Sequence, residues 1–161
     1  MRKVVSLVVA FVMMLGLLCS CASAQQFTKD GLTITLRSTF QDESASPYAE
    51  DMSFLYTSRS CAVMGVKDDR AQLEALLGEL TLEEYGSLII ELNELGGTMS
   101  QREGLWTFTY TATVDNVDYT YLSAVYETDA NFWTVQVYCA SDDYAKLADT
   151  MFGYLKTVTL V

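Results

Sequence analysis

Histidine is absent from the 161-residue sequence, which also has one proline and four cysteines. Without histidine the chain cannot form a Ser-His-Asp triad or a histidine metal site, and it lacks the usual neutral-pH general base. Basic residues are scarce too: 10 Lys and Arg against 21 Asp and Glu give a formal charge of -11. Nucleic acids and anionic bilayers attract basic patches, so this charge argues against both as partners.

Motifs of common catalytic and cofactor sites are also missing. The sequence has no Gly-rich phosphate loop, no G-x-S-x-G elbow and no S-x-x-K frame. Acidic pairs such as Asp68-Asp69 and Asp142-Asp143 lack the D-x-[DN]-x-[DN]-G spacing of a calcium loop. We therefore expect no catalytic residue, no metal site and no cofactor.

Residues 1–24 have the three parts of a secretory signal peptide. Met1-Arg2-Lys3 carries positive charge, an apolar segment runs from Val4 to Leu18, and small residues follow. The apolar segment is short for a membrane-spanning helix, which needs about 20 residues. Ala22-Ser23-Ala24 suits cleavage after Ala24 by ordinary signal peptidase.

A second cleavage site competes with the first. Leu18-Cys19-Ser20-Cys21 resembles a bacterial lipobox, and we favour this interpretation, in which cleavage precedes Cys21 and diacylglycerol is attached to its thiol. The acyl chains would then hold the protein on the outer face of the cytoplasmic membrane of a Gram-positive bacterium. Cleavage after Ala24 would release a secreted form instead.

Residues 25–161 are expected to form a single domain. Arg2 and Lys3 are the only charged residues before Lys29, so their removal takes the formal charge from -11 to -13. Two cysteines remain, Cys61 and Cys139, each in a predicted strand. Export favours disulfides, but a bond requires the two strands to be neighbours. A Cys61–Cys139 disulfide and two buried thiols therefore both remain open.

Within residues 105–114, positions 106 to 114 alternate strictly between aromatic or apolar side chains and threonines, which predicts a β-strand. Asp115-Asn116 suits a two-residue hairpin turn. Such a turn would place Val114 opposite Val117 and Tyr110 opposite Tyr121. The aromatic residues Trp106, Phe108, Tyr110, Tyr119 and Trp133 are expected in the core.

Residues 131–140 form a further predicted strand, with Trp133, Val135 and Cys139 on one face. A loop of three or five residues before it would set Val125 opposite Trp133 or Val135, and we predict this odd length because it keeps apolar residues together. One side of the sheet would then carry a polar face, beside Tyr126 and Tyr138. This face, which is either solvated or a binding surface for a protein or glycan, comprises Thr107, Thr109, Thr111, Thr120, Thr134 and Gln136.

Three helices are predicted between and after the strands. Asp68 or Asp69 caps the first, Thr81 and Glu84 form a capping box for the second, which ends at Gly96-Gly97, and the third starts at Ser141 or Asp142. We expect a linker at residues 25–31 and a mobile loop at residues 41–51. The prediction is an α+β fold with an antiparallel sheet of about six or seven strands packed with helices.

The order of these elements resembles a group of small secreted bacterial proteins, mostly lipoproteins, that look like the PsbP fold of photosystem subunits. The residues that carry the resemblance run over residues 27–161: Phe27 to Leu36, Leu82-Glu83-Glu84-Tyr85, Phe108-Thr109-Tyr110, Tyr119-Thr120-Tyr121, Phe132-Trp133 and Asp143-Tyr144. The resemblance implies a PsbP-like sandwich and a surface location, and it implies no reaction.

Two functions are consistent with these observations. The first is an exported, lipid-anchored surface protein that acts as a non-enzymatic binding or accessory module. The second is a small secreted hydrolase using acidic residues, which would need two carboxyl groups about 5 to 9.5 Å apart in a concave pocket.

Overall fold

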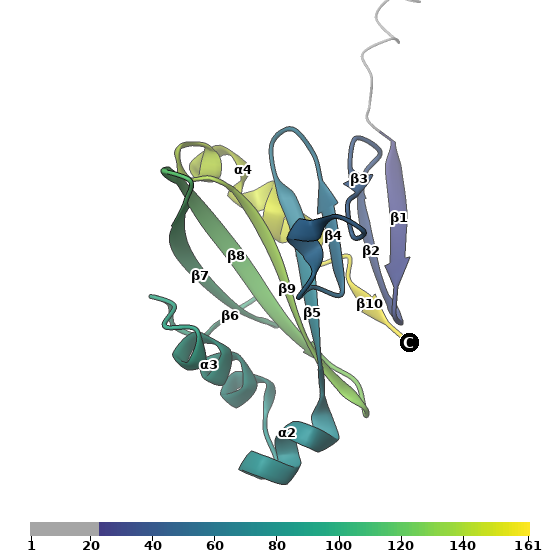
Figure 1. Cartoon of the computed structure of the whole chain (residues 1–161), viewed down its shortest axis with the longest axis vertical. Helices are drawn as coiled ribbons and strands as arrows, with labels where there is room; N and C mark the ends of the chain where they lie inside the picture. The colour runs from purple at the N-terminus through teal and green to yellow at the C-terminus, as the bar shows by residue number, and fades with distance from the viewer. Residues whose placement is uncertain (1–22) are drawn as a thin grey trace, which may run out of the picture.

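The computed structural model describes residues 23–161 (Figure 1). The apolar segment of the predicted signal peptide and the predicted lipid attachment at Cys21 lie outside these residues. The described part contains a large sheet, a small sheet, three α-helices and one 3-10 helix. This arrangement confirms the α+β prediction.

The large sheet has seven strands in the order β3-β4-β5-β9-β8-β7-β6, all antiparallel to their neighbours. Its strands are β3 (Gln41–Asp42), β4 (Phe54–Thr57), β5 (Ala62–Asp69), β6 (Ser100–Arg102), β7 (Leu105–Val114), β8 (Val117–Glu127) and β9 (Asn131–Ala140). The predicted β7–β8 hairpin is confirmed, because Val114 pairs with Val117 and Tyr110 with Tyr121. Asp115 and Asn116 have the positive φ angles, 51° and 63°, that its two-residue turn requires.

The small sheet has three strands in the order β1-β2-β10. They are β1 (Ala24–Lys29), β2 (Leu32–Arg37) and β10 (Thr159–Leu160). The predicted linker at residues 25–31 is therefore wrong. β1 is a mostly exposed edge strand, so it shows no apolar alternation, but the Asp30-Gly31 turn with φ of 52° and 90° pairs it with β2.

Residues 41–51, predicted as a mobile loop, contain β3 and the 3-10 helix η1 (Pro47–Ala49). Ala49 is buried and packs with Leu55 and Ala62. These contacts hold η1 against β4 and β5, in front of which it lies in Figure 1.

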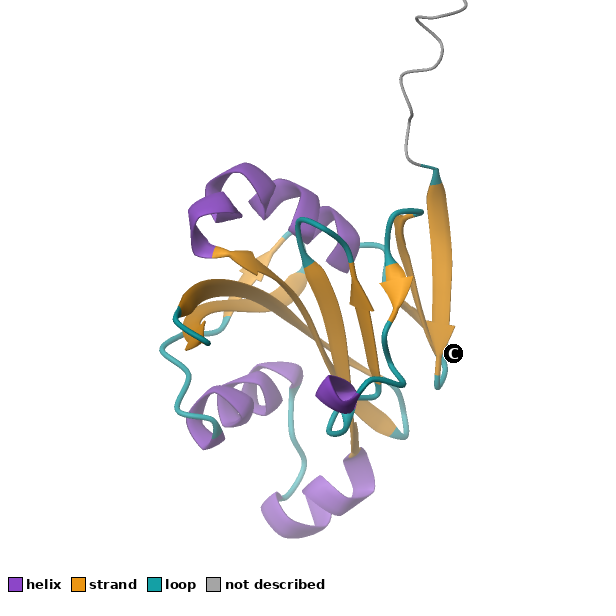
Figure 2. Cartoon of the chain, turned by 45° about the horizontal axis from the view of Figure 1, so that its top comes forward, coloured by secondary structure: helices purple, strands orange, loops and turns teal. Residues whose placement is uncertain are grey.

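Helix α4 (Ser141–Leu155) and the small sheet cover one face of the large sheet, while α2 (Arg70–Leu77) and α3 (Leu82–Leu92) lie on the other face (Figure 2). Apolar side chains of α4, β2 and the large sheet form the main core. Its largest fully buried members are Trp133, Phe54, Phe152, Leu32, Ile34, Leu36, Met151 and Leu155.

A second, smaller core lies under α3, where Tyr85 stacks on Phe132 with ring centroids 4.6 Å apart. The predicted caps are present: Asp69 accepts the amide of Gln72, and Thr81 and Glu84 form the capping box of α3. The helix ends at Leu92, before the predicted stop at Gly96-Gly97, with Asn93 as its C-cap.

The turn between β8 and β9 differs from its prediction. It has two residues, Asp129 and Ala130, closed by a hydrogen bond from the Thr128 amide to the Asn131 carbonyl at 2.8 Å. Val125 consequently pairs with Thr134. The odd-length loop was predicted on the premise of one apolar face. Here Val125 is buried under α3, because this part of the sheet is covered on both faces.

Gly65 on β5 is a close-packed position of the main core. A Cβ atom there would overlap the ring of Phe54, its cross-strand partner, which stacks in turn on Tyr56. We predict that Gly65→Ala lowers the free energy of unfolding by about 1 to 3 kcal/mol through overpacking, measured by urea unfolding.

Gly153 in α4 is the matched control, because a Cβ atom there meets no other atom within 4 Å. Gly153→Ala should stabilise the protein by about 0.5 to 1 kcal/mol, because alanine favours a helix over glycine. Equal effects of the two substitutions would contradict the packing described for Phe54.

Candidate functional site

The predicted polar face does not exist as one surface. The Val125–Thr134 pairing places Thr134 and Gln136 on the α3 side of the sheet, whereas four threonines lie on the α4 side. Those four are Thr107, Thr109, Thr111 and Thr120. Only Thr109 and Thr111 are exposed, since Thr107 and Thr120 are buried and bond to Ser100 and Ser141. The prediction was wrong because it assumed that one side of the sheet is exposed to solvent and carries all of these polar residues.

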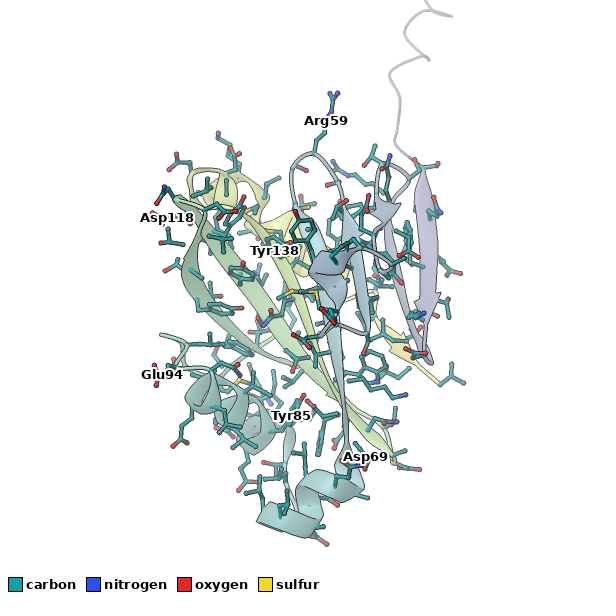
Figure 3. The ribbon with its side chains drawn as sticks, viewed as in Figure 1. Arg59, Asp69, Tyr85, Glu94, Asp118 and Tyr138 are labelled. Atoms are coloured by element: carbon teal, nitrogen blue, oxygen red, sulfur yellow. The ribbon has the colours of Figure 1, made fainter. Side chains whose placement is uncertain are left out.

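A row of aromatic rings crosses the α3 side of the sheet instead. We call it the tyrosine face, and it consists of Tyr110, Tyr119, Tyr121 and Tyr138, from β7, β8 and β9. Tyr110 and Tyr119, which were predicted as core residues, are only half-buried. Helix α3 crosses one end of the sheet, where Tyr85 lies, and Tyr138 is farther along the same sheet (Figure 3).

The tyrosine rings hold one another in place. Tyr121 is sandwiched between Tyr110 and Tyr138, with ring centroids 4.6 and 4.8 Å apart. Tyr119 meets Tyr138 edge-on at 5.9 Å. Side chains stand roughly perpendicular to a sheet, so rings stacked across strands project their hydroxyl ends outward. The result is a row of hydroxyl groups on rigid aromatic supports.

A cavity of about 290 Å³ lies where the tyrosine face meets α3. It is lined by Met64, Val66, Ile89, Asn93, Leu95, Tyr110, Thr134 and Gln136. The Tyr110 hydroxyl donates to Oε1 of Gln136 at 3.2 Å. This bond uses Oε1 of Gln136 as the acceptor, and the amide nitrogen of Gln136 is a donor. We call the eight residues the α3 pocket.

Thr134 also contacts Tyr85, the residue that anchors α3 to the sheet. The hydroxyl of the fully buried Tyr85 donates to Asp68 Oδ2 at 2.6 Å and lies 3.0 Å from Thr134 Oγ1. Burial and the Asp68 carboxylate raise the pKa of Tyr85 above its ordinary value. Tyr85 therefore stays a neutral donor that ties α3 to β5 and β9.

Three tyrosines of the face, Tyr110, Tyr121 and Tyr138, have raised pKa values and are neutral at physiological pH as well. Burial, with Tyr121 alongside, raises the pKa of Tyr110 to about 12. Burial also raises the pKa of Tyr121 and of Tyr138. These side chains are consequently hydrogen-bonding groups, and none of them supplies a phenolate nucleophile or base near neutral pH.

Two carboxyl groups have pKa values below the ordinary value, which is opposite to the shift of an acid catalyst. Hydrogen bonds from Ser44 lower the pKa of Asp42, and hydrogen bonds from Thr81 lower that of Glu84, whereas a glycosidase acid needs a raised value. Glu84 borders a hollow on α3 with Glu83 and Glu91, but it is engaged in the capping box. Within residues 23–161, no three His, Cys, Asp or Glu residues are grouped to hold a metal ion.

Cys61 and Cys139 are both buried free thiols in the structure. The Cys139 thiol lies 3.7 Å from the sulfur of Met151 on α4. Burial raises the pKa of both thiols. Neither cysteine lines the α3 pocket.

Comparison with known proteins yields structural relatives only. No protein-family model and no curated protein matches the sequence. Among solved structures, cyanobacterial PsbP (CyanoP) from Synechocystis sp. PCC 6803 aligns with a TM-score of 0.60 at 11% identity, over 89% of this chain and 95% of that one. The fold is PsbP-like.

Two further structures align with this PsbP-like chain. One, from Bacteroides thetaiotaomicron, has a TM-score of 0.57 at 10% identity over 85% of the chain, which spans about half (48%) of that protein. The other, LpqN of Mycobacterium tuberculosis, described as involved in cell envelope biogenesis, has a TM-score of 0.44 at 12% identity, over 86% of this chain and 91% of that one. At such low identity, the alignments with CyanoP and the Bacteroides protein show a shared fold alone and leave function to the site.

No helix within residues 23–161 is long and apolar enough to cross a membrane.

Proposed function

We propose that the protein is an exported, lipid-anchored binding protein that holds a neutral oligosaccharide on its tyrosine face and catalyses no reaction. The observation that carries the proposal is the row of stacked tyrosines, three of whose four members are only partly buried, beside the α3 pocket. Tyrosine gives a large, rigid contact with a polar end at low cost in conformational entropy.

The lining of the α3 pocket supports an uncharged ligand. All eight of its residues are uncharged. A charged ligand group would lose its hydration there without finding a counter-charge, which is costly. The acidic chain, with a formal charge of -13 once Arg2 and Lys3 are removed with the signal peptide, would also repel anionic polymers.

The polar groups of the site support a ligand rich in hydroxyl groups. Gln136 and Asn93 carry amides that can donate and accept, and Tyr110 and Thr134 carry hydroxyls. Sugars present the same mixture of hydroxyl donors and acceptors along an apolar ring. Met64, Ile89 and Leu95 supply the apolar part of the pocket wall.

The protonation states support binding without turnover. Tyr110 stays protonated near neutral pH because its pKa is raised, and Glu84 stays ionised because its pKa is lowered. Acid–base catalysis instead needs a group whose pKa lies near the working pH. We therefore expect the site to bind its ligand without altering it.

Binding can be tested with a glycan array of maltohexaose, cellohexaose and xylohexaose, with polygalacturonate as the anionic comparison. We predict retention of a neutral glycan, and at least about tenfold weaker binding by Tyr138→Phe and by Gln136→Met, because each loses a hydrogen-bonding group without emptying its site. Thr109→Val is the matched control, because Thr109 is exposed on the opposite side of the sheet.

Three results would contradict the proposal: no retention of any neutral glycan, retention of polygalacturonate alone, or binding that both variants leave unchanged. A steady release of reducing sugar from a bound oligosaccharide would overturn the non-enzymatic part and favour the acidic hydrolase.

The lipid anchor has a separate test, because it rests on residues 18–21 of the sequence. We predict that the mature protein from membranes begins at Cys21 and carries diacylglycerol on its thiol. Mass spectrometry of the N-terminal peptide measures this directly, and a chain that begins at Gln25 with no lipid would refute the anchor.

A further inference from the structure

Cys61 and Cys139 lie opposite each other at one end of the β5–β9 pair. The ladder pairs Val63 with Val137 and Ala62 with Tyr138. Antiparallel pairing continues by one residue in each direction, so the next position brings Cys61 against Cys139. Both side chains point to the α4 side, because both belong to the main core with Val63 and Val137.

The backbone of Cys61 shows which kind of cross-strand pair this is. Its carbonyl accepts the Ser58 amide at 2.9 Å, and its amide donates to the Ser58 hydroxyl at 3.3 Å. Both backbone groups are thus directed toward Ser58, before the turn, and away from β9. Cys61 and Cys139 therefore form a non-hydrogen-bonded pair, in which facing Cα atoms are about 4.5 Å apart and side chains are closest.

That separation falls within the range of about 4.4 to 6.8 Å that a disulfide requires between Cα atoms. Both cysteines also border a cavity of about 300 Å³, together with Arg59, Tyr119 and Asp143. Arg59 lies at the tip of the β4–β5 turn (Figure 3). The two cysteines thus have the spacing of a disulfide and lie beside a cavity, although their thiols are buried.

We propose that Cys61 and Cys139 form a reversible disulfide after export, which fastens β5 to β9. The oxidant is a disulfide, either of an oxidoreductase or of glutathione. One thiol, as thiolate, attacks that disulfide and releases one of its sulfurs; the second thiol then displaces the other. Two cysteine thiols become one S–S bond, and the oxidant's disulfide becomes two thiols, which accounts for both electrons and both protons.

The disulfide would have two consequences for the molecule. Cys139 would exchange its contact with the Met151 sulfur for a covalent bond to β5. It would also constrain the strand position beside Tyr138, which carries the outer ring of the tyrosine stack. Because burial raises the pKa of both thiols, exchange with the folded protein should be slow unless it is catalysed.

The test uses the full chain, equilibrated with oxidised glutathione in the presence of a disulfide isomerase, then denatured in urea with iodoacetamide and digested with trypsin. The sequence separates the cysteines, because Cys61 falls in the peptide 60–67, Cys139 in the peptide 103–146, and Cys19 and Cys21 in the peptide 4–29. We expect peptides 60–67 and 103–146 to be joined, at about 2 Da below the sum of the reduced peptides, and to separate with dithiothreitol. Cys61→Ser is the control and should leave Cys139 alkylated.

Thermal unfolding of the oxidised and reduced protein tests the same disulfide without relying on recovery of the tryptic peptides. Reduction should lower the Tm of the oxidised protein by roughly 10 °C, because a disulfide closing a loop of this length restricts the unfolded chain. The Tm of Cys61→Ser should not respond to reductant. Alkylation of both cysteines after oxidation, or a bond from either one to Cys19, Cys21 or a second chain in place of the internal bond, would overturn the proposal.

Discussion

The pairing of β8 with β9 determines the face on which every side chain in the centre of the sheet lies. Side chains alternate along a strand, so a slip of one residue would exchange the two faces completely. The two-residue turn at Asp129-Ala130 directs Trp133 and Val135 toward α4. The same turn directs Phe132 and Gln136 toward α3. Both cores and the candidate site depend on this register.

The two faces are covered unequally, and this inequality creates the tyrosine face. On one side, α4 and the small sheet bury a continuous apolar core. On the other side, α3 is 11 residues long and packs over the smaller core that contains Phe108, Val125 and Phe132. Tyrosine suits the uncovered strands beyond α3, because its ring packs against its neighbours while its hydroxyl remains hydrated. The same tyrosines therefore complete the packing of the sheet and form the proposed binding surface.

Features with a complete local signal could be predicted from sequence. The β7–β8 hairpin combined strict alternation with the Asp115-Asn116 turn, and its register was correct residue by residue. The capping box at Thr81 and Glu84 was equally local. The PsbP-like sandwich followed from the order of such elements, and the structural relatives agree with it.

Features that depend on distant coverage could not be predicted. Val125 was predicted to pair with Trp133 or Val135 on the assumption that only one face of the sheet is apolar. It pairs with Thr134 instead, because α3 covers the second face there. Tyr110 and Tyr119 were placed in the core because a sequence does not show how far α3 extends across the sheet. β1 was not predicted because a mostly exposed edge strand lacks the alternation of apolar and polar residues that indicates a strand. The Asp30-Gly31 turn, with positive φ at both residues, was a local signal for it.

The central claim is that ligand binding occurs on the uncovered part of the α3 side of the sheet. NMR spectra of protein labelled with ¹³C-tyrosine test it most directly, because the 10 tyrosines are distributed over both sides of the sheet and the helices. On titration with maltohexaose, cellohexaose or xylohexaose, the account predicts saturable shifts for Tyr110, Tyr119, Tyr121 and Tyr138, and unchanged signals for Tyr144 and Tyr154. Shifts confined to Tyr144 and Tyr154, or no shift with any of the three sugars, would contradict it.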